Sequence, residues 1–129
     1  MKLNERARRL IDGKNFGYLA TVMKDGSPQV TPVWVDRDGD YVLVNTAMGR
    51  VKQKNSKRNP KVAIAIADAS NQYDKVTIRG VVTEQTTRGA DEHIDKLAKK
   101  YRGLEKYPRH SPTEKRVILK IKAESVFSG

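Results

Sequence analysis

Three stretches of this chain alternate between apolar and other residues with a period of two. In 61–67, Val62, Ile64 and Ile66 alternate with alanines, and similar patterns occupy 75–84 and 116–126. A period of two places successive side chains on opposite faces, which is typical of a β-strand and incompatible with a helix. The alternation therefore predicts three strands. The alanine face of 61–67 must be met closely by another strand, a helix or a flat ligand.

Three more strands are predicted near the N-terminus, over 18–23, 29–35 and 41–45. Turn signals separate them, Lys24-Asp25-Gly26 and Asp38-Gly39. Pro28 and Pro32 indicate that the second of these strands lies at an edge or a bulge. Short turns between consecutive strands favour antiparallel pairing.

Helices are expected over 5–12, 89–101 and the basic stretch after Asn45. The first begins after a capping Asn4, and the second carries an apolar stripe at Ile94, Leu97, Ala98 and Tyr101. About six strands with apolar residues on both faces close most easily into a barrel, which removes exposed edges. We therefore predict a mainly β fold, a small β-barrel with peripheral helices, formed by residues 1–129 as a single domain.

The stretch from Tyr41 to Pro60 reads as a strand that runs into a short basic helix. Thr46 is a plausible N-cap, and Arg50 and Lys52 fall in the first two turns. Cations at this end do not stabilise a helix, but they suit a bound phosphate, which the helix dipole also favours. The alternative is that these cations belong to an ordinary solvated helix face.

Composition narrows the possible functions. The chain has 26 Lys and Arg against 15 Asp and Glu, a net charge of +11, which favours anionic partners. It has no cysteine and two histidines, of which His93 is expected to be exposed or structural. Neither a metal site, a catalytic dyad nor a nucleotide-binding glycine motif is evident, so any chemistry is expected to be carried by a cofactor. Nucleic-acid binding is the second class to consider, although aromatic residues are only 6%. The chain has neither a signal peptide nor a membrane-spanning segment, and a cytoplasmic location is expected.

An ordered set of motifs resembles one known family. The motifs are L-A-T, D-G-x-P-Q-x-T-P-V-W, D-G-D, V-N-T, G-R-x-K and N-P-x-V, followed by VTIRG and DEHIDKLAKKYRG. Together they resemble the pyridoxamine 5'-phosphate oxidase-like enzymes of the split-barrel flavin-reductase superfamily, and within them the branch that uses the deazaflavin coenzyme F420. The resemblance runs from Arg9 to Val126.

What the resemblance implies is specific. The fold would be a six-stranded antiparallel split barrel of the FMN-binding type, forming an intertwined homodimer with the cofactor at the subunit interface. Arg50 and Lys52 match the phosphate anchor, and Asn45 and Thr46 match the strand end beside the phosphate arm. The segment whose backbone passes the cofactor ring is matched by Gln29, Val30, Thr31 and Pro32. Contacts from the partner subunit are expected at Tyr73 and Arg79.

The implied function is that of an F420-dependent oxidoreductase, which transfers a hydride between reduced F420 and a small organic acceptor with an activated double bond. Val51 separates the two anchor cations, and the chain ends without the substrate-binding elements of true pyridoxamine phosphate oxidases. Two alternatives stay open: an FMN-binding pyridoxamine 5'-phosphate oxidase-like flavoprotein, and a non-catalytic basic protein that binds a cofactor or nucleic acid.

Overall fold

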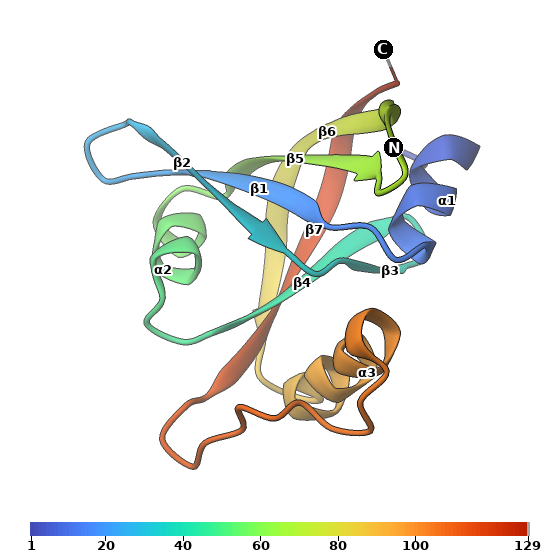
Figure 1. The fold of residues 1–129 in the computed structure, drawn as a ribbon. Helices are drawn as coiled ribbons and strands as arrows, with labels where there is room; N and C mark the ends of the chain where they lie inside the picture. Colours follow the sequence, from blue (N-terminus) through green and yellow to red (C-terminus); the bar gives the residue numbers. More distant parts are fainter. Residues whose placement is uncertain (129) are drawn as a thin grey trace.

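Seven strands form one antiparallel sheet in the computed structural model, which describes residues 1–128 (Figure 1). The strands are β1 (Gly17–Val22), β2 (Pro28–Val33), β3 (Asp36–Asp38), β4 (Tyr41–Ala47), β5 (Lys61–Asp68), β6 (Asn71–Thr86) and β7 (Arg116–Phe127). They pair in the order β2-β1-β5-β6-β7-β4-β3. The two edge strands, β2 and β3, are joined by Trp34 and Val35 alone. The sheet therefore curls until its two edges lie only this two-residue connection apart. They do not pair with each other within residues 1–128, which leaves the barrel split.

The predicted mainly β antiparallel architecture is confirmed, with one strand more than expected. The additional strand, β3, is only three residues long and pairs with the start of β4, where Asp36 lies opposite Leu43. Its sequence, Asp-Arg-Asp, has no apolar residue, and only Asp38 of these three residues belongs to the predicted turn Asp38-Gly39. The edge position of β2 is also as predicted from its two prolines.

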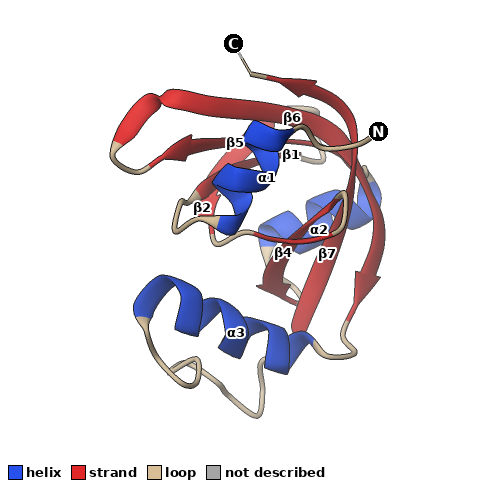
Figure 2. Cartoon of the chain, turned by 90° about the vertical axis from the view of Figure 1, so that its right-hand side faces the viewer, coloured by secondary structure: helices blue, strands red, loops and turns tan. Residues whose placement is uncertain are grey.

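Three helices lie outside the sheet: α1 (Glu5–Asp12), α2 (Val51–Arg58) and α3 (Ala90–Arg102). Figure 1 shows α1 near both chain ends and α2 on the other side of the barrel, and in Figure 2 α3 stands apart below the sheet. The Asn4 side chain accepts a hydrogen bond from the Ala7 N–H at 2.8 Å, as a cap should. Asn4 also donates to the hydroxyl of Ser128, which ties the two ends together.

The core lies inside the curled sheet, where the predicted alternation is confirmed. Val62, Ile64 and Ile66 of β5 are buried, whereas Ala65 on the opposite face is exposed. Gly80 lies at a shift of register between β6 and β7. A Cβ added there would lie 2.1 Å from the carbonyl oxygen of Lys122, so only glycine allows the two strands to approach this closely.

Helix α3 has its own small core. Ile94, Leu97 and Tyr101 are buried, as the apolar stripe predicts, and Trp34 stacks on Tyr101 with ring centroids 5.4 Å apart. The Tyr101 hydroxyl donates to the Asn15 carbonyl at 2.6 Å and accepts the Val35 N–H at 3.1 Å. These contacts fix α3 against the segment that joins the two sheet edges.

The predicted start of the basic helix is wrong. Strand β4 continues through Thr46 and Ala47, and the N-cap of α2 is Arg50. The chain turns at Gly49, whose φ of +90° suits glycine, and the Gly49 N–H donates to the Gln53 side chain at 2.9 Å. Thr46 therefore does not cap the helix and is left in the strand.

Among the described residues, none of the helices is long and apolar enough to cross a membrane.

Candidate functional site

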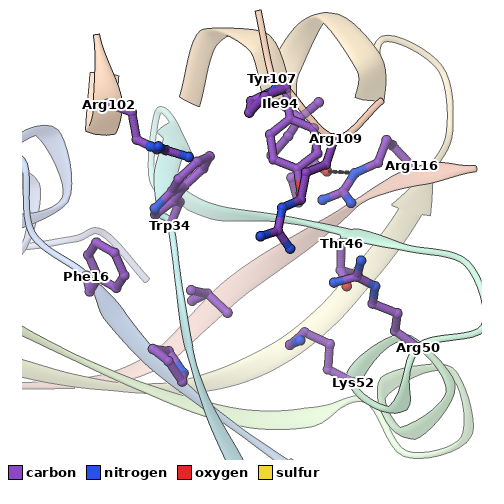
Figure 3. A pocket seen from close by; sticks show the side chains of 14 residues that line it. Phe16, Trp34, Thr46, Arg50, Lys52, Ile94, Arg102, Tyr107, Arg109 and Arg116 are labelled. Atoms are coloured by element: carbon purple, nitrogen blue, oxygen red, sulfur yellow. Dashed lines mark hydrogen bonds between the residues drawn. The ribbon is translucent and has the colours of Figure 1, made fainter. Parts of the chain in front are cut away.

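A cavity of about 290 Å³ opens between the ends of β2 and β4, the start of α2, helix α3 and the loop that leads from α3 to β7. Figure 3 shows its two ends: aromatic side chains on one side, and the strand-to-helix turn of α2 on the other. The aromatic lining residues are Phe16, Trp34 and Tyr107. We call this cavity the pocket.

The pocket is lined by five cations: Arg50, Lys52, Arg102, Arg109 and Arg116. They come from four places in the chain, the start of α2, the end of α3, the loop after it and the first residue of β7. No Asp or Glu of the described residues lines it. Such a concentration of positive charge in a concave surface is suited to an anionic ligand.

The start of α2 adds backbone donors to this charge. Among the described residues, no side chain caps its N-terminus, and the first turn contains no acidic residue. The first N–H groups of a helix have no partner within the helix and carry the positive end of its dipole. Arg50 and Lys52 stand beside them, so this end of the pocket has the composition of a phosphate site.

Lys52 is held as a cation under unfavourable conditions. It is half-buried, and both burial and the nearby charges of Arg50 and Arg116 lower its pKa. It makes no salt bridge within residues 1–128. An anion in the pocket would offset these costs by pairing with the Lys52 ammonium group, which is how binding sites for charged groups are commonly built.

Thr46 supplies a second indication of a ligand. Its side chain is buried, with 2% of its surface exposed, and it lines the pocket. The hydroxyl oxygen makes no hydrogen bond to any described residue. Buried polar groups are normally paired, so this hydroxyl is available to a group that enters the pocket. Thr46, Arg50, Lys52 and the open helix end fit the phosphate of a flavin or deazaflavin cofactor, because all of them can donate hydrogen bonds.

Glu114 holds two of the pocket arginines in place. Its carboxylate lies 2.9 Å from Arg50 Nη2 and 2.8 Å from Arg116 Nη1. The hydrogen bond from Arg116, together with that from Arg50, lowers the pKa of Glu114 despite some burial. Arg116 has only 5% of its side chain exposed, and its guanidinium lies over the ring of Tyr107 at 5.2 Å. Glu114 therefore links Arg50 to Arg116, and Tyr107 adds a second contact to Arg116.

Of the predicted site residues, the structure brings five together in the pocket: Pro32, Asn45, Thr46, Arg50 and Lys52. The other three residues of the predicted ring segment, Gln29, Val30 and Thr31, precede Pro32 on the edge strand β2. Tyr73 and Arg79 do not reach the pocket of their own chain. Tyr73 is 88% exposed at the start of β6, and Arg79 is exposed further along the same strand.

Sequence reasoning did not identify Arg102, Arg109 and Arg116 as pocket residues. Arg116 reaches the pocket because β7 pairs with β4 and sets it opposite Ala47, next to Thr46. This pairing joins residues about seventy positions apart, and no local pattern reveals it. The only available signal was a charged residue at the start of a predicted strand.

The His93 side chain is structural rather than exposed, with 9% of its surface accessible. Its ring nitrogens contact Asp36 and Asn45 at 3.0 and 3.1 Å. Within residues 1–128, no group of three or more His, Cys, Asp or Glu side chains is arranged to hold a metal ion.

Known proteins resemble this chain over nearly its whole length. The family model described as pyridoxamine 5'-phosphate oxidase matches residues 3–128. A solved structure described as an F420 reductase is similar to this chain with 28% sequence identity and a TM-score of 0.85, and the match covers 98% of this chain and all of the other.

More distant structures share the fold. A candidate pyridoxamine 5'-phosphate oxidase from Lactobacillus delbrueckii is similar at 25% identity with a TM-score of 0.68, covering 98% of this chain and 93% of the other. The HupZ protein of Group A Streptococcus is 23% identical with a TM-score of 0.69, covering 97% of this chain and 92% of the other, and shows the fold alone.

Proposed function

Because this chain belongs to the pyridoxamine 5'-phosphate oxidase family, whose members are F420- or FMN-dependent oxidoreductases, we propose that it is an F420-dependent reductase. It would transfer a hydride between reduced F420 and a small organic acceptor that carries an activated double bond. The observation that carries the proposal is the group of anion-binding residues at the start of α2, Thr46, Arg50 and Lys52. The structural match to the F420 reductase, which extends over all of that chain, supports it.

The residues at that end have separable roles. Arg50 presents a planar guanidinium fork, and Lys52 a mobile point charge, to the phosphate oxygens. The Thr46 hydroxyl and the first N–H groups of α2 complete the set of donors. Asn45 and Glu114 do not need to touch the ligand, because they orient Arg116 and Arg50.

The edge strand β2 is suited to receive a flat ring. Proline is tolerated on an edge strand where its missing N–H would have faced away from the neighbouring strand. Pro28 and Pro32 therefore mark the free side of β2, and Val30 lies between them with the same parity. On this free side, the N–H of Val30 can donate a hydrogen bond to a ring that carries amide-like groups. The carbonyls of Pro28, Val30 and Pro32 can accept hydrogen bonds from such a ring.

The reduced deazaflavin supplies a two-electron hydride when bound. The chain's contribution is to hold the cofactor by its phosphate, to lay the ring along β2 and to leave one face for the acceptor. The pocket is near the lower limit of the 300–1,000 Å³ typical of ligand sites. We propose that a second copy of the chain completes the site and that Tyr73 and Arg79 are among the residues it contributes.

An FMN-binding flavoprotein is the second candidate, since F420 and FMN share the tricyclic ring system and the first phosphate. Fluorescence titration of cofactor-free protein with each cofactor, at two ionic strengths, separates the two. We expect submicromolar affinity for F420, weaker affinity for FMN and a larger salt effect for the more highly charged F420. Tighter binding of FMN would favour the flavoprotein. Failure of both to bind would refute the proposed function.

A further inference from the structure

A series of hydrogen-bonded polar side chains connects Asp36 of β3 to Arg116, one of the cations that line the pocket. His93 Nε2 lies 3.0 Å from Asp36 Oδ2, and His93 Nδ1 lies 3.1 Å from the side-chain nitrogen of Asn45. The Asn45 oxygen accepts from Arg116 Nε at 2.9 Å. His93 belongs to α3 and takes no part in the proposed function as described above, yet it is one residue removed from a pocket arginine.

The orientation of the Asn45 amide is determined by its other neighbours. The Nε–H of Arg116 can only donate, so the group facing it must be the amide oxygen. The carbonyl of Ala90 can only accept, and it lies 2.8 Å from the amide nitrogen. Both neighbours require the same orientation, and rotating the amide by half a turn would break both bonds.

This orientation determines the state of His93. The Asn45 nitrogen points a hydrogen at Nδ1, so Nδ1 must be the unprotonated, accepting nitrogen. The ring hydrogen is then on Nε2, where it is donated to Asp36. His93 is therefore neutral in this arrangement, with a defined tautomer.

A second proton on His93 would set two donors against each other. If the Asn45 amide rotates to accommodate it, the amide nitrogen faces the Nε–H of Arg116. If the His93 ring withdraws instead, Asn45 loses one of its fixed partners. In either case the contact with Asn45 no longer fixes Arg116. Arg116 then keeps only its contacts with Glu114 and Tyr107, and Glu114 also binds Arg50.

The charges around His93 are Asp36 from β3, which Lys96 of α3 also contacts at 3.1 Å, and Arg116 from β7 behind Asn45. Asp36 favours a charged ring, whereas Lys96 and Arg116 oppose it. Burial and the charges of Arg50 and Arg116 lower the pKa of Lys52, so any positive charge that Lys52 gains in acid would strengthen the binding of an anion rather than weaken it.

We infer that His93 is a positioning residue: in its neutral form it fixes Asn45 and, through it, the Arg116 guanidinium toward the anion site, and its protonation weakens anion binding in acid. The identity of the natural anion rests on the proposed function, but the inference itself does not require a particular cofactor. Neither hydrogen bond of Arg116 uses Nη2, which is left to contact an anion.

The test uses sulfate as the probe, because its charge does not change over the range in which histidine titrates. Trp34 is the only tryptophan of the chain and lines the pocket, so its fluorescence reports occupancy. From about pH 8 to about pH 5.5 we expect the sulfate affinity of the wild type to fall about tenfold, the effect of losing one hydrogen bond to a charged group.

Two variants assign the effect. His93→Asn retains an acceptor near the position of Nδ1 and does not titrate, so it should bind sulfate as the wild type does at pH 8 and keep that affinity in acid. His93→Leu removes the acceptor and should bind weakly at every pH. Wild-type binding that is constant or tighter in acid would overturn the inference, and so would a persisting loss of affinity in His93→Asn.

A measurement on the wild type protects the test against variants that fail to fold. Nitrogen NMR of the imidazole rings in cofactor-free protein should show His93 at neutral pH with an unprotonated Nδ1 and a protonated Nε2. Its titration should share a midpoint with the loss of sulfate binding. The opposite tautomer would refute the inference. Absence of F420 and FMN binding together with the expected sulfate results would refute the proposed function alone.

Discussion

Lys52 and Lys54 lie two positions apart on the same helix but have different surroundings. Lys52 lines the pocket and is half-buried beside two arginines, whereas Lys54 is exposed and lies outside the pocket lining. The sequence shows both as members of one basic run. The two lysines differ only in which side of α2 they lie on: Lys52 faces the pocket, whereas Lys54 faces water.

We predict that Lys52→Ala weakens cofactor binding by about 1.5–3 kcal/mol, the range for a hydrogen bond to a charged group. Folding should change little, because the substitution relieves repulsion from Arg50 and Arg116. Lys54→Ala is the matched control and should bind normally. Equal affinities for the two variants in a fluorescence titration would show that Lys52 does not contact the phosphate.

At the scale of elements, the individual strands and helices were largely predictable, but their partners were not. The alternation around Ile64 and Leu119 revealed which residues face the core, because burial on one face of a strand repeats every two residues. The stripe through Ile94 and Tyr101 did the same for α3. Strand β3 was missed because it is short and polar, and Thr46 was misplaced because β4 runs on beyond the apolar pattern.

The candidate site was predictable only where a local motif marked it. Arg50 and Lys52 stand out because cations at a helix start are unfavourable without a ligand. Arg116 and the contact between His93 and Asn45 depend on β4 meeting β7 and α3. Such long-range contacts are set by the curling of the whole sheet, and no pattern within a single segment encodes them.

One contact between elements has a predictable pH dependence. Asp36 of β3 is partly buried, which raises its pKa, but hydrogen bonds from His93 and Lys96 of α3 outweigh burial and bring the pKa well below its usual value. A carboxyl group with a depressed folded-state pKa stabilises the fold above its unfolded value, about 3.9, and this contribution is lost as the pH falls through the folded-state pKa.

Asp36→Asn should therefore lower the free energy of unfolding by about 1–3 kcal/mol at neutral pH. The difference from the wild type should shrink as the pH falls below about 4. Urea unfolding monitored at several pH values measures both effects. Asp38→Asn, an exposed neighbour on the same strand, is the control. A deficit that stays constant down to the lowest pH would mean that the charge of Asp36 is not what stabilises the contact.

For the whole molecule, the outer face of β5 and β6 is the feature that a single chain leaves unexplained. Ala63 and Ala65 lie opposite Arg79 and Thr77 in the register, so these residues share one face of the sheet. Ala65, Thr77 and Arg79 are exposed on it. Large apolar residues are also exposed elsewhere on the sheet, with Tyr18 at 49%, Val30 at 62% and Phe127 at 65%. Small side chains allow another backbone to approach closely, and exposed aromatic residues are common at interfaces.

We predict that the chain is a homodimer that uses this face and that the cofactor site depends on it. Sedimentation at micromolar concentration should give about twice the 14.5 kDa mass of the chain. Ala65→Arg should yield a folded monomer, because Ala65 is exposed in the single chain and a large charged residue is tolerated there only without a partner. If a second copy supplies Tyr73 and Arg79 to the pocket, this variant should also lose cofactor affinity, whereas Lys99→Ala on the exposed side of α3 should change neither property. A wild-type monomer that binds the cofactor normally would instead place the entire site within one chain.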